Sequence, residues 1–257
     1  MWHNRSVSVV FPVYNEEQGI VKAINDFFAT GVVDEVIAVD NNSKDRSAEL
    51  IRSTRATLVT ETRQGYGFAL RRGLAEAKSD LVILAEPDGT FLGKDVLKLL
   101  VYSDDFDIVL GTRTTPQLVW KGANMGFAMR TGNWIVAKMI EFLFNTASLS
   151  DCGCTLRLLS RDAAQRIGPL LTVGKSHLLP EIVVLGSLHR YKMIEIPVNY
   201  CVRLGESKIT GDFKKTVKVA LNMITLVLRY RISSWFQPRP AADPQPTPEQ
   251  FSRRESR

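Results

Sequence analysis

Short apolar runs alternate with amphipathic stretches along the first 113 residues. Five runs have the length and the β-branched content of buried strands, at 7–13, 34–40, 56–61, 79–88 and 106–113. Stretches with helical spacing of apolar residues lie between them, at 16–30, 43–53, 67–78 and 96–103. This alternation predicts an α/β fold, with a mostly parallel sheet and helices on both of its faces.

The pattern changes after about residue 117. A long helix is expected within 122–147, with Ile135, Met139 and Phe142 beside Val136, Ile140 and Leu143 on a single apolar face. Another helix at 177–188, a strand at 191–200, a loop at 203–210 and a helix at 213–236 are expected further on. The segment 237–257 contains five prolines and no core-forming pattern, so we expect one domain over 1–236 and a disordered tail.

Polar residues gather where the predicted strands end. The four clusters read FPVYNEE (11–17), VDNNSKD (39–45), AEPDGT (85–90) and GTR (111–113). The carboxyl ends of parallel strands meet at one edge of a sheet, and ligands of such sheets bind outside that edge. The sequence therefore predicts a polar site there.

Two carboxylates, Glu86 and Asp88, stand one residue apart in this edge. Such a pair can form half of a site for Mg²⁺ or Mn²⁺, completed by the phosphates of a substrate. The alternative is a solvated turn, since EPDG favours turns by itself. Asp40 can accept hydrogen bonds from a base or a ribose, whereas Tyr14 and Glu16 fit either ligand binding or a helix start.

Composition and charge narrow the partners. A net charge of +6 and a pI near 9.3 suit phosphate-bearing molecules or an anionic membrane. Three cysteines are too few for a disulfide framework, so a reducing compartment is expected. The cations are spread along the chain without a nucleic-acid-binding motif, which argues against nucleic acid. We expect no signal peptide and no membrane-spanning segment.

The motifs together resemble those of the family-2 glycosyltransferases with the GT-A fold. The matching stretches are FPVYNEE, VDNNSKD, RQGYGFALRRG (63–73), AEPDG and GTR. DCGCTLRLLSR (151–161) and RLGESK (203–208) resemble, more narrowly, the polyprenyl- and dolichyl-phosphate sugar transferases, including the dolichol-phosphate mannose synthases. The likeness covers roughly residues 5–235 and implies a Rossmann-like GT-A sheet flanked by helices.

The resemblance implies a role for each matching residue. The nucleotide-sugar pocket would contain Pro12, Tyr14, Glu16, Asp40, Asn42, Glu86 and Asp88. Glu86 and Asp88 match the DXD motif that holds Mg²⁺ or Mn²⁺, although the family usually has Asp first. The phosphates of donor and acceptor would bind Arg113, Arg130, Arg203 and Lys208, unless these are surface cations. Asp88, Arg113 and Arg203 would be the catalytic residues. CTLR at 154–157 departs from the GFR that is more common in the family, so the resemblance gives little support for a functional role of Arg157.

The implied activity is metal-dependent, inverting transfer of a sugar from GDP-mannose or a UDP-hexose to polyprenyl or dolichyl phosphate. A phosphate monoester is largely dianionic at neutral pH and needs no general base. One alternative is a glycan or small-molecule alcohol as the acceptor, for which Asp151 would be the nearest candidate for the general base. With a phosphate acceptor, Asp151 would instead organise its loop. Another is a nucleotide-sugar-binding protein without catalysis.

A lipid acceptor requires contact with a bilayer. For 122–147, the sequence leaves membrane and core open. For 213–236, the alternatives are a core helix and a helix at a membrane surface or a partner subunit. Basic residues before an apolar stretch (Lys214, Lys215, Lys218) and aromatic residues after it (Trp235, Phe236) favour the membrane surface or partner. We expect amphipathic helices at the membrane interface, a peripheral location on the cytoplasmic face, and either a homo-oligomer or a membrane partner protein.

Overall fold

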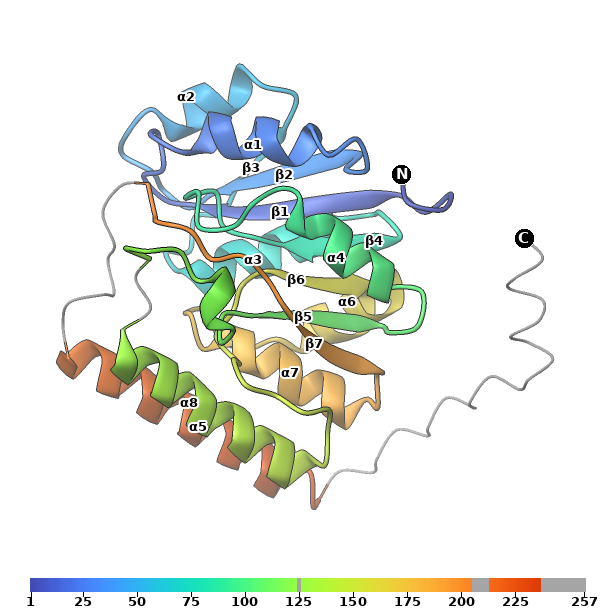
Figure 1. The fold of residues 1–257 in the computed structure, drawn as a ribbon, viewed down its shortest axis with the longest axis vertical. Coiled ribbons are helices and arrows are strands. Elements are labelled where there is room, and N and C mark those ends of the chain that lie inside the picture. Colours follow the sequence, from blue (N-terminus) through green and yellow to red (C-terminus); the bar gives the residue numbers. More distant parts are fainter. Residues whose placement is uncertain (124–125, 205–212, 237–257) are drawn as a thin grey trace.

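The computed structural model describes residues 1–123, 126–204 and 213–236, which form a sheet between two helical layers (Figure 1). Seven strands in these residues form one sheet in the order β3-β2-β1-β4-β6-β5-β7. Their bounds are β1 Val7–Val13, β2 Glu35–Asp40, β3 Thr57–Thr60, β4 Leu81–Leu84, β5 Ile108–Thr112, β6 Arg157–Ser160 and β7 Met193–Pro197. Lys208 and the segment 237–257 lie outside the described residues, so the expectations for them stay predictions.

One strand runs against the others. β6 is antiparallel to both β4 and β5, and every other pairing in the sheet is parallel. The predicted α/β sheet is therefore confirmed as mostly parallel. The apolar pattern did not predict β6, because this strand has only four residues, RLLS, and continues directly into α6 (Arg161–Ile167). Ser160 caps that helix by accepting a hydrogen bond from the backbone N–H of Ala163.

Helices cover both faces of the sheet. The bounds of the helices are α1 Ile20–Phe28, α2 Ser47–Arg52, α3 Tyr66–Glu76, α4 Asp95–Tyr102, α5 Phe127–Phe144, α6 Arg161–Ile167, α7 Leu178–Leu188 and α8 Phe213–Ser233. Neighbouring residues of a strand point to opposite faces. In β1, Val9 and Phe11 accordingly join the core beneath α1, α2 and α4, whereas Val10 joins the core beneath α3, α6 and α7. Both faces are buried, which explains the continuous apolar runs of the central strands.

α5 and α8 lie side by side along one margin of the molecule, and both pack on α7 (Figure 1). Val136 and Ile140 of α5 are buried, but Ile135 and Phe142 are 48% and 86% exposed. The predicted apolar face of α5 is thus buried along the row that contains Val136 and Ile140 and exposed at Ile135 and Phe142. The two rows lie about 100° apart on one broad side of the helix, so the core covers one row well and the other only in part, at Met139.

α8 also has an inner and an outer side. Met223, Leu226 and Val227 are buried in the core, whereas Leu228 and Ile232 are exposed. The inner side carries a polar anchor as well. Tyr230 donates a hydrogen bond of 2.8 Å to Glu181 of α7, a fully buried carboxylate that also accepts hydrogen bonds from the backbone N–H groups of Thr172 and Val173. α8 is thus docked on the domain through one side only.

No helix in the described ranges is both long enough and apolar enough to cross a bilayer.

The two sides of α8 should respond differently to the same substitution. Val227→Asp puts a charge into the core and should lower the free energy of unfolding by about 3 kcal/mol or more. Leu228→Asp replaces an exposed side chain and should change the free energy of unfolding by less than about 1 kcal/mol. Urea unfolding followed by circular dichroism measures both. Equal losses in the two variants would contradict the two-sided packing.

Candidate active site

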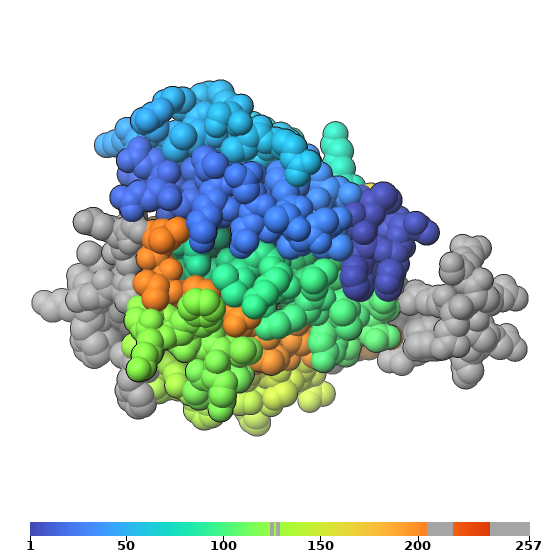
Figure 2. All heavy atoms as spheres, turned by 45° about the horizontal axis from the view of Figure 1, so that its top comes forward, coloured from blue at the N-terminus to red at the C-terminus, as the bar shows by residue number. Residues whose placement is uncertain are grey.

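The loops after β1, β2, β4 and β5 meet at one edge of the sheet, as the sequence predicted. The segment that follows β7, drawn in orange in Figure 2, lies between the N-terminal part of the chain in blue and the segment after β5 in green. Its backbone is tied to the EPDG turn, because Leu204 N–H donates to Asp88 O (2.7 Å) and Cys201 N–H donates to Thr90 O (2.8 Å). These bonds place Arg203 over the carboxylates.

Asp88 is buried at the centre of this edge. Its Oδ1 accepts hydrogen bonds from the backbone N–H and the hydroxyl of Thr90, which fix the orientation of the carboxylate. Its Oδ2 lies 2.9 Å from Nη1 of Arg203 but has no hydrogen-bond donor with suitable angles among the described residues. Gly89 has a φ of +79°, a conformation that glycine adopts without strain and that turns the chain sharply after the carboxylate.

Glu86 lies beside Asp88 and is held by two hydroxyl groups. Thr155 donates to Oε1 of Glu86 (2.7 Å), and the hydroxyl of Tyr66 lies 3.1 Å from the same oxygen and 2.6 Å from Thr155 Oγ1. Burial, followed by the negative charge of Asp88, raises the pKa of Glu86 to about 7. Negative charge on both buried carboxylates at once is therefore unfavourable.

Arg203 joins two of the predicted site residues. Its guanidinium forms ion pairs with both Glu16 and Asp88. Burial by itself lowers the pKa of Arg203, but the charges of Asp88 and Glu16 outweigh this and raise it. Its Nε is buried without a hydrogen-bond acceptor in the described part of the chain. Arg203 thus brings a positive charge to the carboxylates at this edge.

The carboxylate pair fits a divalent cation as a half-site. Asp88 Oδ2 is a buried oxygen without a hydrogen bond from the described residues, and Glu86 brings a second carboxylate next to it. Within those residues, no group of three or more His, Cys, Asp or Glu side chains forms a fuller site. A metal ion held by this pair would therefore depend on oxygens from a substrate.

The predicted nucleotide-binding residues lie around the ends of β1 and β2. Pro12 pairs with Val39 across these strands, and Asp40 is the last residue of β2, with Tyr14 and Asn42 in the loops that follow. Asn42 has a φ of +63° and donates to Thr62 O. The structure therefore brings the predicted residues to one edge, while their roles stay predictions.

Asn41 organises this part of the site, and sequence reasoning gave it no role. Its side-chain amide donates to the carbonyl oxygens of Glu61 and Arg63 (both 2.8 Å), and its Oδ1 accepts from the backbone N–H of Gly65 (2.7 Å). One buried amide thus joins the loops after β2 and β3. The VDNNSKD motif contains this asparagine, but its partners lie about 20 residues away in the chain.

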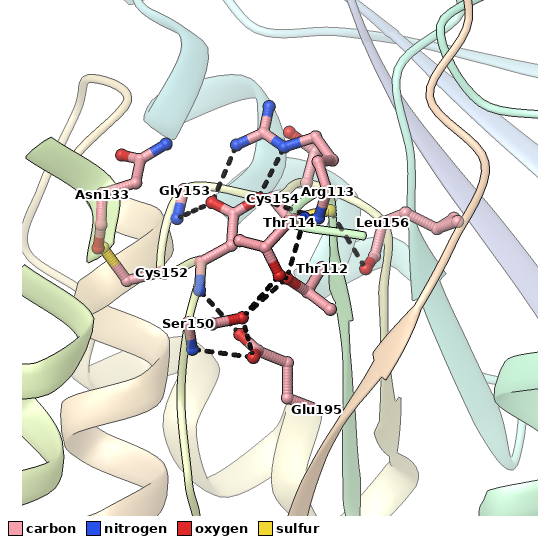
Figure 3. Close-up of polar contacts among 12 residues, drawn as sticks. Thr112, Arg113, Thr114, Asn133, Ser150, Cys152, Gly153, Cys154, Leu156 and Glu195 are labelled. Carbon is pink, nitrogen blue, oxygen red and sulfur yellow. Dashed lines mark hydrogen bonds and ion pairs between the residues drawn. The ribbon is translucent and has the colours of Figure 1, made fainter. Parts of the chain in front are cut away.

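Arg113 is paired with Asp151 (Figure 3). Its Nε and Nη2 donate to the two carboxylate oxygens at 2.7 and 2.9 Å, and its guanidinium lies over the ring of Tyr200. Burial alone would raise the pKa of Asp151, but the charge and hydrogen bonds of Arg113 lower it. Asp151 is therefore a poor general base. The same pairing occupies two of the donors with which Arg113 is predicted to bind phosphate.

Glu195 of β7 fixes the loop that carries Asp151. It accepts hydrogen bonds from the backbone N–H groups of Ser150 (2.7 Å) and Asp151 (2.8 Å) and from the hydroxyl of Ser150, as Figure 3 shows. Burial raises the pKa of Glu195, while these hydrogen bonds oppose the rise. The hydroxyls of Thr112, Thr114 and Ser150 form a cluster with separations of 2.9 Å beside this network.

An open hollow lies between this hydroxyl cluster and α5. It has a volume of about 570 Å³ and is lined by Thr114, Arg130, Thr131, Trp134 and Ser150. Arg130 is exposed and donates to Thr114 O (3.3 Å), which holds its guanidinium at the rim. The hollow offers hydroxyls, a cation and an indole ring to a ligand.

Sequence reasoning missed three residues that shape the site. Tyr66 and Thr155 hold Glu86, and the ring of Tyr200 lies against the Arg113 guanidinium. Tyr66 lies within RQGYGFALRRG and Thr155 within CTLR, so both were in motifs already recognised. Their contacts depend on which strands are neighbours, and the sequence did not show that β6 lies next to β4.

The fold and the sequence identify the class of protein. The model of glycosyl transferase family 2 matches residues 8–168, which is more than half of the 257 residues. The chain belongs to this family, and it is a glycosyltransferase with a GT-A-like fold.

Its curated relatives include enzymes that act on dolichyl phosphate. A dolichyl-phosphate hexose transferase from Haloferax volcanii is 30% identical over 229 residues, covering 88% of this chain and 96% of that protein. The dolichyl-phosphate beta-glucosyltransferase ALG5D of Trichomonas vaginalis is 23% identical and covers 89% and 75% of the two chains.

Solved structures support the fold. Glucosyl-3-phosphoglycerate synthase from Mycobacterium tuberculosis, in complex with Mn²⁺, UDP and glucosyl-3-phosphoglycerate, matches with a TM-score of 0.69 at 17% identity. The match covers 88% of this chain and 80% of that one. At this identity the likeness concerns the fold alone.

The raised pKa of Glu86 predicts that the stability of the metal-free protein depends on pH. Between about pH 4.5 and 7 the folded chain keeps a proton that the unfolded chain releases, so the free energy of unfolding falls as pH rises through this window. Glu86→Gln removes the titration and retains the hydrogen-bonding shape. In EDTA, the variant should exceed the wild type by about 1–3 kcal/mol at pH 8 and by less at pH 5. Urea unfolding at both pH values measures the difference, and a difference independent of pH would contradict the prediction.

Proposed function

We propose that this protein is a metal-dependent, inverting glycosyltransferase that moves a sugar from a nucleotide-sugar donor to polyprenyl or dolichyl phosphate at a membrane surface. The observation that carries the proposal is the carboxylate pair Glu86–Asp88 at the carboxyl edge of the sheet, with Arg203 placed against it. The family adds the reaction class, and the dolichyl-phosphate relatives support the acceptor.

The donor would bind with its diphosphate over the carboxylate pair. Glu86 and Asp88 would hold Mg²⁺ or Mn²⁺, which when bound offsets the charge that develops on the leaving diphosphate. Arg203, which has an Nε without an acceptor among the described residues, would direct its guanidinium to the phosphates. Pro12, Tyr14, Glu16, Asp40 and Asn42 would surround the nucleotide. GDP-mannose and UDP-hexoses are the donors to test.

The acceptor phosphate would approach from the side of the hollow beside α5. Arg130 and the hydroxyls of Thr114 and Ser150 offer donors for its oxygens, and Lys208 is a further candidate. A phosphate oxygen attacks the anomeric carbon, the bond from that carbon to the diphosphate breaks, and its electron pair leaves with the nucleoside diphosphate. Direct displacement inverts the anomeric configuration, so an α-linked donor yields a β-linked product.

The pairing of Asp151 favours a phosphate acceptor over an alcohol. An alcohol acceptor calls for a base that can take its proton, and Asp151 is held by two hydrogen bonds from Arg113 with a lowered pKa. A phosphate with a second pKa of about 6 carries its nucleophilic charge already. The role left to Asp151 is to position Arg113 and its loop.

α5 and α8 would provide the membrane contact. Exposed large apolar side chains on the two helices are Trp134, Ile135, Phe142, Leu221, Leu228 and Ile232, and Trp235 and Phe236 follow in the turn after α8. The sequence of 213–236 has five lysines and arginines and no acidic residue, which suits an anionic leaflet. The hollow opens beside α5, so a bilayer at these helices would present lipid phosphate to it. The protein would then act as a peripheral enzyme at the cytoplasmic face.

Transfer activity tests the reaction and the acceptor together. With Mn²⁺ and radiolabelled GDP-mannose, UDP-glucose or UDP-N-acetylglucosamine, label should enter the organic phase with a short polyprenyl phosphate and not with the matching polyprenol. Asp88→Asn should lower turnover by about a hundredfold or more, because it removes a charge from the half-site. Asp105→Asn, an exposed aspartate after α4, is the matched control.

The outcomes separate the alternatives. Transfer to the polyprenol as well would indicate an alcohol acceptor. Nucleotide binding without transfer from any donor would support a binding protein without catalysis. Activity retained in Asp88→Asn would contradict the assignment of the carboxylate pair.

The membrane contact can be tested with variants that stay folded. Leu228→Asp combined with Ile232→Asp should weaken flotation with vesicles of phosphatidylcholine and phosphatidylglycerol by about tenfold or more, since two apolar side chains lose their place in the interface. Val101→Asp changes an equally exposed valine on α4 and should leave binding unchanged. Unchanged flotation of the α8 variant would show that α8 does not contact the bilayer.

A further inference from the structure

We propose that Tyr66 and Thr155 act as a hydroxyl clamp that positions Glu86 for cation binding. The inference rests on the proposed metal dependence and assigns a task to two residues outside the expected set of site residues. Both hydroxyls contact the same oxygen of Glu86, Oε1, at 3.1 and 2.7 Å, and they lie 2.6 Å from each other.

The backbone brings the three groups together from distant parts of the chain. β4 and β6 are antiparallel with Leu84 opposite Arg157, and continuing that register by two residues places Glu86 opposite Thr155. Thr155 is buried, and its chain neighbours Cys154 and Leu156 hold this segment in the core. Its hydroxyl is therefore fixed in place next to the carboxylate.

Tyr66 is fixed just as firmly at the first position of α3. Gly67 N–H donates to Gly174 O (3.0 Å), and a Cβ atom at Gly65 would stand 2.2 Å from the same carbonyl oxygen. The residue before Tyr66 must therefore be glycine, and the start of α3 is held against the 172–175 loop. This contact sets the position from which the tyrosine hydroxyl reaches Glu86.

The clamp solves a problem that is specific to glutamate. Glutamate has one more rotatable bond than aspartate, so its carboxylate loses more conformational freedom when it is held at a defined point. Two hydroxyls on Oε1 restrict that freedom in advance and leave Oε2 for the cation. Groups that orient a metal ligand in this way commonly change metal affinity when they are removed. Tyr66 and Thr155 are thus positioning residues for Glu86.

The test is the affinity for Mn²⁺, measured by electron paramagnetic resonance of free Mn²⁺ in the presence of UDP or GDP. Thr155→Val should weaken Mn²⁺ binding about tenfold, and Tyr66→Phe should weaken it in the same direction. Thr155→Ser keeps the hydroxyl and should stay within about twofold of the wild type. Thr112→Val removes a hydroxyl at the same sheet edge that does not contact Glu86, and serves as the matched control.

A double substitution separates positioning from a general structural effect. Aspartate at position 86 is too short by one methylene to reach the clamp. Adding Thr155→Val to Glu86→Asp should therefore cause no further loss of Mn²⁺ affinity, whereas a structural role would give the same loss in both backgrounds. Thermal unfolding checks that each variant is folded. If Thr155→Val does not fold, Tyr66→Phe is combined with Glu86→Asp in its place.

The outcomes distinguish this inference from the proposed function. If the wild type binds no Mn²⁺ with either nucleotide, the metal dependence is wrong and the clamp with it. If the wild type binds Mn²⁺ but Thr155→Val and Tyr66→Phe bind it equally well, the clamp is wrong and the metal dependence stands. A loss of the same size in the Glu86→Asp background would also overturn the clamp.

Discussion

The organisation of this molecule depends on holding two carboxyl groups close together at the end of a buried strand. Each carboxylate loses water on burial, and each raises the cost of charge on the other. Asp88 is oriented by Thr90 and faces Arg203, whereas Glu86 lies between two hydroxyls with a pKa near 7. Two negative charges at this place are costly, and the guanidinium of Arg203 offsets part of this electrostatic strain.

The rest of the active-site edge opposes or exploits that strain. The segment after β7 is bound to the EPDG turn through its backbone, so Arg203 is delivered to the carboxylates by the fold and not by its own flexibility. A second ion pair, Arg113–Asp151, lies nearby and is supported by Glu195 through the backbone. One cluster thus has an excess of negative charge and the other is internally balanced. The first cluster contains the proposed metal-binding residues, and the second holds the loop that carries Asp151 in place.

Much of the sheet was predictable because both of its faces are buried, which leaves continuous apolar runs with polar ends. Asp88 and Arg203 could be singled out from motifs, and the structure places them in contact. Contacts set by strand order could not be predicted. The clamp on Glu86 needs β6 beside β4, and the four residues of β6 gave too short a signal. The exposure of Ile135 and Phe142 on α5 has a related cause, since a sequence shows which residues are apolar but not how much of an apolar face the core covers.

The late, antiparallel strand in the middle of the sheet has a consequence for how the chain folds. β4 and β5 follow each other in sequence but are not neighbours, and the gap between them is filled only when residues 157–160 arrive. Until that point a growing chain exposes two unpaired strand edges, and the pairing that removes them closes a loop containing all of α5. The pairing of β6 therefore joins β5 to the rest of the sheet and closes the loop that contains the helix beside the hollow. A fragment that ends before residue 157 would contain β1 to β5 but lack β6, which joins β4 to β5, and β7, which pairs with the other side of β5.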